Sequence, residues 1–165
     1  MYYQSPVGLI KINIQDGFIN EIIFLDDKNE MSNYDSEEKI AVENNAVCKK
    51  SKKQFDEYFS GKRTIFDLPV KQSGTTFQEK VWNELIKIPF GKTISYLQLS
   101  QRIGNAKSIR AVGTANGRNN LSIVVPCHRV IGSDGSLTGY GGGLWRKQWL
   151  LEHENKYANG VSLLF

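Results

Sequence analysis

Residues 93–116 read TISYLQLSQRIGNAKSIRAVGTAN, a stretch with the pattern of two short helices joined by a tight turn. Ser95 can cap the first helix. The apolar residues of that helix are Leu97, Leu99 and Ile103. Gly104-Asn105 supplies the turn, and a second helix is expected over about 107–116. The pair has the shape of a helix-turn-helix, although such helix hairpins also occur in proteins that never bind DNA.

The second of these helices has an unusual surface, because most of its exposed positions are small. Its small residues are Ala111, Gly113, Thr114 and Ala115, with Arg110 projecting among them. Small side chains let a helix backbone approach a partner closely. The partner is then either another helix of the same protein or DNA.

A further helix is expected just before this pair. The composition changes near Ser73-Gly74-Thr75, which marks a domain boundary, and Thr75 or Thr76 can cap the helix. Its apolar stripe at helical spacing consists of Phe77, Val81, Leu85 and Ile88. Pro89-Phe90-Gly91 ends it.

The N-terminal half is predicted to be β-rich. Apolar and polar residues alternate over 10–15, Asp16-Gly17 supplies a hairpin turn, and residues 18–25 return as the partner strand. Three further elements are expected: a loop over 26–39, a helix over 40–59 that stops at Gly61, and a short strand over 65–70.

Residues 121–143 combine an apolar run, a cysteine–histidine pair and a glycine-rich loop. Ile123-Val124-Val125 is predicted to be a buried strand, which Pro126 ends because it lacks a backbone N–H. Cys127 and His128 would then sit at the end of that strand, rigid yet reachable. The glycine-rich loop after them can fold over a small substrate.

A cysteine after valines is often a small buried hydrophobe, but His128 and Arg129 favour an activated thiol here. Neighbours in an extended chain point to opposite sides, so a water bridge between Cys127 and His128 is at least as reasonable as direct contact. A third group should orient the imidazole, and Glu154 is one candidate among surface-type carboxylates. Trp145 and Trp149, one helical turn apart, are expected in the core.

The overall composition excludes several classes of protein. The net charge of +4 and the pI of about 9.0 favour an anionic partner. Two cysteines and two histidines are too few for a zinc finger or a disulfide scaffold, and we expect no metal site and an unpaired, structural Cys48. The first six residues are not a signal peptide and no run is long enough to span a membrane, so we expect a cytoplasmic protein.

The segment Pro126-Cys127-His128-Arg129-Val130 closely resembles the active-site signature of the O6-alkylguanine-DNA alkyltransferases, also called methylated-DNA–protein-cysteine S-methyltransferases. The agreement runs in order from about Phe77 to Glu154. It includes the segments GKTISY (91–96), RAVG (110–113) and GYGG (139–142). The N-terminal half is similar to the variable β-rich domain of that family.

The resemblance implies an α+β (α/β mixed) fold, with a β-rich, RNase H-like domain over 1–73 and a helical, winged helix-turn-helix-like domain over 74–165. It implies direct-reversal DNA repair: an alkyl group leaves O6 of guanine for Cys127, irreversibly and without a cofactor. The partner would be double-stranded DNA, bound from the minor groove by a monomer with little sequence specificity, in the cytoplasm on the nucleoid. The alkyl size, action on O4-alkylthymine and cooperativity on DNA stay open.

Five residues match the catalytic positions of the family. Cys127 would accept the alkyl group, His128 would act as its base through a bound water, and Glu154 would orient His128. Tyr96 would rotate the damaged nucleotide and donate a proton to the departing guanine. Asn119 would brace the turn that holds the active-site segment.

Other residues match the DNA-binding and base-binding positions. Arg110 would enter the stack in place of the flipped base, with Tyr96 beside it. The small residues expected to approach the minor groove are Ala111, Gly113, Thr114 and Ala115. The base pocket would be lined by Val125, Pro126, the Cys127 carbonyl, Tyr140 and Gly141.

The sequence departs from the family pattern at three points. Asn120 stands where proline usually follows the asparagine, so the turn is expected to be less rigid. Gly141 replaces a hydroxyl residue of some relatives, which predicts a roomier pocket. The N-terminal zinc ligands of some members are missing.

Three rival functions remain for the sequence alone. A non-catalytic damage-binding relative would lack the cysteine that this chain has. A cysteine hydrolase or redox enzyme would use Cys127 and His128 but leave Arg110 without a role. A plain winged-helix DNA-binding module would leave the Pro-Cys-His segment unexplained.

Overall fold

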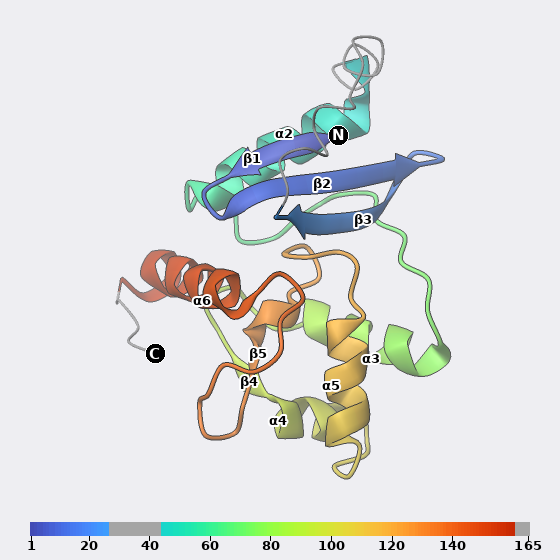
Figure 1. Ribbon diagram of the computed structural model, residues 1–165, viewed down its shortest axis with the longest axis vertical. Helices are drawn as coiled ribbons and strands as arrows, with labels where there is room; N and C mark the ends of the chain where they lie inside the picture. The colour runs from blue at the N-terminus through green and yellow to red at the C-terminus, as the bar shows by residue number, and fades with distance from the viewer. Residues whose placement is uncertain (27–43, 161–165) are drawn as a thin grey trace. The chain divides into compact units, whose positions relative to one another are not determined.

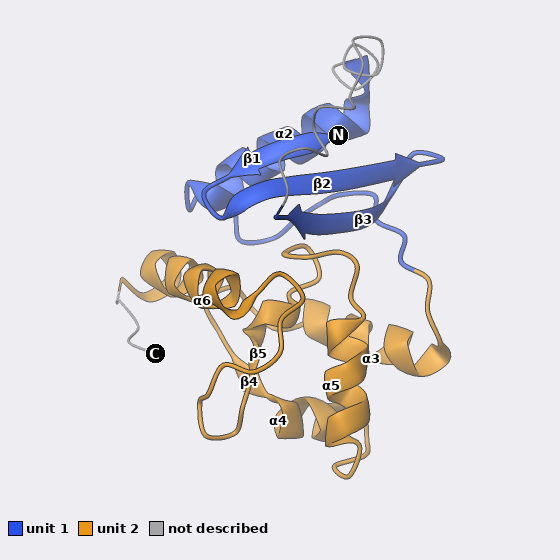
Figure 2. Ribbon diagram, in the orientation of Figure 1, with its two compact units in different colours: residues 1–72 blue, residues 73–165 orange. Residues whose placement is uncertain are grey.

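The computed structural model describes residues 1–26 and 44–160, and the chain divides into two compact units, residues 1–72 and 73–165 (Figure 2). The first unit holds a three-stranded sheet with a helix, and the second is mainly helical (Figure 1). This confirms the predicted mixed α+β fold class. In the described part of the chain, no helix is long and apolar enough to cross a membrane.

The sheet of the first unit is antiparallel, in the order β1-β2-β3. Its strands are β1 (Tyr2–Ser5), β2 (Gly8–Gln15) and β3 (Phe18–Leu25). The predicted hairpin is confirmed: Asp16 and Gly17 have φ angles of 52° and 78°, and positive φ at both central residues defines the tight turn that matches the twist of two strands. Ile12 pairs with Ile22, and both side chains are fully buried.

Helix α2 (Ala46–Phe59) covers this sheet with aromatic side chains. The rings of Tyr3 and Phe55 lie 5.4 Å apart, and the Tyr3 hydroxyl donates a hydrogen bond to Asp56 at 2.9 Å. The Asn45 side chain caps the helix, and Gly61, with a φ of 74°, follows its end as expected. The predicted loop over 26–39 and the first residues of the predicted helix fall largely outside the described residues.

The strand predicted over 65–70 is wrong. Val70 alone forms a single bridge, to Ile19. The backbone of Asp67 bonds instead to the Gln54 side chain, with its N–H at 2.9 Å and its carbonyl at 3.0 Å. The Gln54 side chain thus satisfies the backbone of Asp67, and only the end of the segment pairs with β3, through the hydrogen bonds of Pro69 and Lys71 to Ile19.

The second unit is built from the three helices that the sequence predicts, α3 (Thr76–Ile86), α4 (Tyr96–Arg102) and α5 (Ile109–Gly117). Thr75 and Ser95 each cap a helix through a reciprocal pair of hydrogen bonds with the glutamine three residues later. The helices meet over fully buried side chains, which include Val81, Leu85, Leu99 and Val112. Helices α4 and α5 form the expected helix-turn-helix pair.

The remaining elements follow α5 in the chain, and one of them pairs with the segment just before α4. A short 3₁₀ helix η2 (Cys127–Arg129) leads into β5 (Val130–Ile131), which pairs in parallel with β4 (Ile94–Ser95) just before α4. The last helix, α6 (Leu144–Asn159), then follows the glycine-rich loop. This pairing brings the Cys127 segment next to the start of the helix-turn-helix.

Two further expectations for this unit are wrong. Residues 123–125 form a turn and no strand, because Val125 N–H bonds to the Leu121 carbonyl at 2.8 Å and Ile123 has a φ of 72°. Cys127 therefore begins a 3₁₀ helix and does not end a strand. Trp145 is not in the core, since it is 56% exposed and Arg146 stacks over its ring at 4.6 Å. Trp149 is half-buried and stacks on His153.

Candidate active site

Cys127 lies at the first position of η2, and only 6% of it is exposed. Asn119 holds both the sulfur and the turn before it. Its Nδ2 donates to Cys127 Sγ at 3.1 Å and to the Val125 carbonyl at 2.8 Å, while its Oδ1 accepts from Leu121 N–H at 3.0 Å. Asn119 thus links the Cys127 sulfur to both ends of the turn that precedes it.

Two opposing influences act on the ionisation of the Cys127 thiol. Burial is the largest influence and raises its pKa. The Asn119 hydrogen bond, the charge of Lys147 and the backbone N–H groups of Cys127 and His128 work in the opposite direction. Each of these groups favours a thiolate, but burial outweighs them and keeps the pKa of the Cys127 thiol above its ordinary value.

His128 and Glu154 form a fully buried pair. His128 Nε2 lies 2.8 Å from Glu154 Oε1, and neither side chain is more than 1% exposed. Burial lowers the pKa of His128, so we take the imidazole as neutral, with its Nε2–H donated to the carboxylate. Its Nδ1 is then an unprotonated acceptor, and it has no hydrogen-bond partner among the described residues.

Arg129 keeps Glu154 ionised. Its Nε and Nη2 donate to the two carboxylate oxygens at 2.8 and 2.9 Å, and its Nη1 donates to the Ile88 carbonyl at 2.6 Å. Gly91 N–H donates to Glu154 Oε2 at 3.1 Å. Burial opposes the charge on Glu154, but His128, followed by Arg129, outweighs it and holds the pKa of this carboxyl well below its ordinary value.

A second cluster surrounds the carbonyl of Thr138 in the glycine-rich loop. The Tyr96 hydroxyl donates to this carbonyl at 3.2 Å, and Lys147 Nζ donates to the same oxygen at 2.8 Å. Lys147 Nζ also lies 5.8 Å from the centre of the Tyr96 ring. Burial lowers the pKa of Lys147 to about 8, against the opposing influence of Cys127.

Sequence reasoning missed three members of this site: Lys147, Arg129 as the partner of Glu154, and Asn116. Lys147 was detectable, because it shares one face of α6 with Leu150, Leu151 and Glu154 at helical spacing, and a lysine on an apolar stripe is unusual. Asn116, buried at the end of α5, donates to the Cys127 carbonyl at 3.3 Å. No local pattern pointed to that contact.

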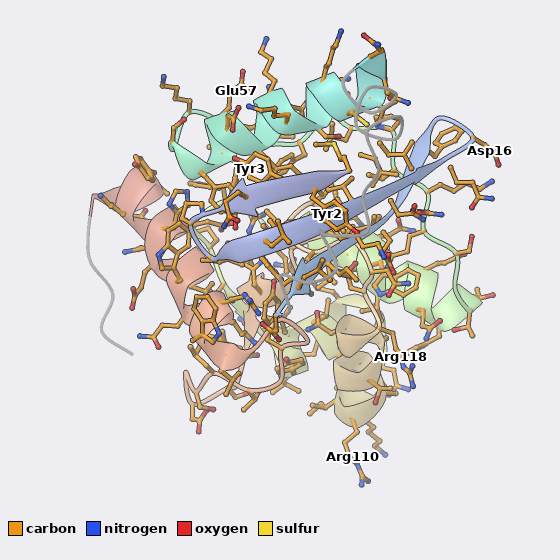
Figure 3. The ribbon with its side chains drawn as sticks, turned by 45° about the horizontal axis from the view of Figure 1, so that its top comes forward. Tyr2, Tyr3, Asp16, Glu57, Arg110 and Arg118 are labelled. Carbon is orange, nitrogen blue, oxygen red and sulfur yellow. The ribbon has the colours of Figure 1, made fainter. Side chains whose placement is uncertain are left out.

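The small residues expected to approach DNA are not all at the surface of α5. Ala111 and Thr114 are exposed, and Gly113 lies against the Tyr96 ring, 3.9 Å from where a Cβ would stand. Arg110 projects from this helix, and Arg118 follows its end (Figure 3). Ala115 was wrongly placed on the DNA face, since it is 2% exposed and its carbonyl accepts a hydrogen bond from Trp82 Nε1 at 2.9 Å.

The expected base-pocket residues are divided between the interior and the loop. Val125 and Pro126 are buried directly before Cys127. The Tyr140 hydroxyl is buried, and this burial together with nearby Cys127 raises its pKa well above the ordinary value. Gly141 is exposed, and a Cβ there would meet nothing within 4 Å among the described residues.

No three histidine, cysteine or acidic side chains of residues 1–26 and 44–160 gather in a way that could hold a metal ion. Cys48 is buried and free in α2.

Two family models match the chain, one for each unit. Residues 1–72 match the ribonuclease-like domain of 6-O-methylguanine DNA methyltransferase, and residues 76–156 match its DNA-binding domain.

Known proteins with this similarity cover nearly the whole chain. A methylated-DNA–protein-cysteine methyltransferase of Methanosarcina acetivorans is 41% identical over 157 residues, covering 93% of this chain and 98% of the relative. One of Mycolicibacterium paratuberculosis is 40% identical over 161 residues, with 98% and 94% covered. The crystal structure of Mycobacterium tuberculosis OGT in complex with DNA aligns with a TM-score of 0.77 at 37% identity, covering 95% of this chain and 92% of that one.

Proposed function

The chain belongs to the 6-O-methylguanine DNA methyltransferase family, and from this premise we propose which residue takes which part in its reaction. It is a methylated-DNA–protein-cysteine methyltransferase, which repairs DNA by direct reversal. Its acceptor is Cys127. One observation carries this assignment: Asn119 donates a hydrogen bond to the Cys127 sulfur, and the next residue in the chain, His128, forms the buried pair with Glu154.

The transfer forms one bond and breaks one. The sulfur of Cys127 bonds to the alkyl carbon as the bond from that carbon to guanine O6 breaks. The thiol proton passes through a water molecule to Nδ1 of His128, the acceptor that no described residue occupies. Glu154, kept anionic by Arg129, stabilises the imidazolium that results.

The departing guanine needs a proton, and Tyr96 supplies it. Its hydroxyl lies in the cluster with Lys147 and donates to the Thr138 carbonyl, a bond it can exchange for one to the base. The proton taken up by His128 later returns to the tyrosine through solvent. The product on Cys127 is a thioether, which no group of the site can hydrolyse, so each molecule acts once.

DNA is the partner of this chain. We place the duplex on α5, with the minor groove against Ala111, Gly113 and Thr114, because a groove of that width requires small side chains. Arg110 enters the stack where the alkylated base leaves it, which partly offsets the cost of unstacking. The minor groove displays little sequence information, as a repair protein requires.

The test follows methyl transfer from a duplex carrying one O6-methylguanine, at increasing excess of DNA, with the modified peptide mapped by mass spectrometry. We expect one methyl group per protein, on Cys127. Cys127→Ser should bind the same duplex and accept nothing. Cys48→Ser, which changes the other buried and free cysteine, should react at the unchanged rate.

Two outcomes would contradict the proposal. Methyl transfer to the Cys127→Ser variant would show that another residue is the acceptor, and repeated turnover would show that the methyl group is removed from the sulfur.

The same DNA titration, followed by sedimentation, tests whether the protein is a monomer and whether it binds DNA cooperatively. We also propose that the protein works in the cytoplasm on the nucleoid, where its DNA partner lies, which imaging of the tagged protein tests.

A further inference from the structure

Gly91 contacts the buried Glu154 side chain from outside the segment that carries the reactive residues. Its backbone N–H donates a hydrogen bond to Glu154 Oε2 at 3.1 Å. His128 and Arg129, which also bond this carboxylate, both belong to η2 and so hold it through one short piece of backbone. The Gly91 N–H therefore gives the carboxylate a second point of attachment, independent of η2.

The segment that ends at Gly91 bonds both members of the buried ion pair. The Ile88 carbonyl accepts a hydrogen bond from Arg129 Nη1 at 2.6 Å, while the Gly91 N–H donates to Glu154. Residues 88–91 thus supply an acceptor to the cation and a donor to the anion. A buried ion pair is stable only when such additional hydrogen bonds satisfy it, so the position of this segment decides how firmly the pair is held.

Position 91 has room only for a residue without a side chain. Gly91 has a φ of 70°, in the left-handed region that favours glycine. A Cβ there would overlap with the Cβ of Ala158 and stand 3.2 Å from the carbonyl oxygen of Glu154. Ala158 lies one turn after Glu154 on α6, so the backbone of Gly91 packs directly against the turn that carries the carboxylate. A side chain at position 91 would push this turn away.

We propose that Gly91 is a positioning residue of the transfer reaction, whose missing side chain lets residues 88–91 approach α6 closely enough to hold Glu154 against His128. The inference rests on the proposed role of His128 as the base that takes the proton of Cys127. A displaced carboxylate orients the imidazole less well and stabilises the imidazolium less. A side chain at position 91 therefore slows deprotonation of the thiol.

Two variants test the contact, Gly91→Ala and the double variant that combines it with Ala158→Gly. Single-turnover methyl transfer from an O6-methylguanine duplex is measured at pH 7 over a range of DNA concentrations. Gly91→Ala should lower the limiting rate about tenfold, the value of one hydrogen bond to a charged group, at an unchanged half-saturating DNA concentration. Ala158→Gly removes the atom that the new Cβ would overlap, so the double variant should recover to within about threefold of Ala158→Gly alone.

The pH dependence of the loss distinguishes positioning of the base from general damage to the site. At alkaline pH the Cys127 thiol ionises without His128, because hydroxide takes its proton. The ratio of the parent rate to the Gly91→Ala rate should therefore fall toward one as the pH rises from 7 to about 10. A distorted site with an intact base would show the same ratio at every pH.

The matched control is Gly17→Ala, in the N-terminal unit. Gly17 also has a positive φ, of 78°, but a Cβ there would meet nothing within 4 Å among the described residues. The substitution introduces similar backbone strain without the overlap, so it should lower the melting temperature and leave transfer unchanged. Circular dichroism measures the unfolding of every variant.

Several results would overturn the inference. One is an unchanged rate for Gly91→Ala, and another is a loss that Ala158→Gly does not reverse or that stays constant with pH. A Gly91→Ala chain that does not fold, beside normal transfer by the double variant, would limit the contact to folding and overturn it as well. If the parent protein transfers no methyl group to Cys127, the proposed function fails, and the inference falls with it for that separate reason.

Discussion

A buried lysine next to a thiol shapes this site at the scale of single residues. Lys147 is fully buried, its Nζ bonds the Thr138 carbonyl, and its charge favours ionisation of Cys127. Yet burial lowers the pKa of the amine to about 8 from an ordinary value of 10.5. Lys147 therefore stabilises a thiolate at the expense of the stability of the fold, a common trade at functional sites.

Lys147→Met should separate these two effects. At pH 7 we expect alkyl transfer about tenfold slower, because a cation near the developing thiolate is lost. We also expect a melting temperature raised by a few degrees, since the buried charge is gone. Single-turnover transfer and thermal unfolding measure the two changes.

The stability that Lys147→Met is expected to gain should depend on pH in a definite direction. The unfolded chain holds the lysine proton up to about pH 10.5, whereas the folded chain releases it near pH 8. The cost of burying the charge is therefore full below pH 8 and declines as the pH rises from 8 to 10.5. The stability gap between Lys147→Met and the parent should narrow across that window, and a gap of constant size would contradict this reading of Lys147.

The sequence predicts three reactive residues, but it does not point to two of the polar side chains that the structure places around them. Cys127, His128 and Glu154 occur in a recognisable pattern, and the structure brings them together. Asn116 and Lys147 reach the site only because α5 and α6 fold against η2. Contacts of that kind depend on tertiary packing, which periodicity in one segment does not contain.

At the scale of elements, α5 presents two arginines whose roles should differ. Arg110 stands near the start of the helix and Arg118 follows its end (Figure 3). Arg110→Ala should slow repair of an O6-methylguanine duplex by tenfold or more, because nothing replaces the extruded base. The same variant should react normally with free O6-alkylguanine, which has no stack to leave.

Arg118→Ala is the matched control for that prediction. We expect it to weaken binding to all duplexes alike and to reduce the salt dependence of binding by about one counterion, as loss of a phosphate contact does. At saturating DNA its transfer rate should be normal. Equal losses on duplex and free base for Arg110→Ala would exclude a role in extrusion.

The elements themselves were predictable where local signals were strong. Thr75 and Ser95 mark helix starts through glutamines three residues on, and Asp16-Gly17 marks the hairpin. The strands predicted over 65–70 and 123–125 failed because side chains of Gln54 and Asn119 take over backbone hydrogen bonds there. Apolar residues alone do not reveal whether a second strand is available.

At the scale of the whole molecule, the buried ion pair of Glu154 and Arg129 makes the stability of the fold depend on pH in the acid range. Burial opposes the charge of Glu154, but His128 and Arg129 hold its folded pKa well below the ordinary 4.5. Glu154 therefore contributes stability above that ordinary value, which is lost as the pH falls toward the folded pKa. Unfolding by acid should begin in this range.

Glu154→Gln tests this link. Removing the carboxylate leaves Arg129 as an unpaired buried charge, so we expect a loss of about 3 kcal/mol at pH 7 and a flatter stability profile below pH 5. Glu57→Gln is the control, because Glu57 also pairs with an arginine, at 2.7 Å, but with both side chains about a quarter exposed. Its cost should stay below about 1 kcal/mol. Similar losses for both variants would contradict a special role of the buried pair.

The exposure of Trp145 has a consequence for the intrinsic fluorescence of the protein. It is 56% exposed directly after the glycine-rich loop, and it carries the Arg146 guanidinium on its ring, while Trp82 is buried and Trp149 half-buried. An external quencher such as iodide should therefore extinguish the emission of Trp145 first. Iodide quenching of the intrinsic fluorescence therefore reports, without a label, whether the surroundings of Trp145 change when a duplex binds or when the sulfur is alkylated.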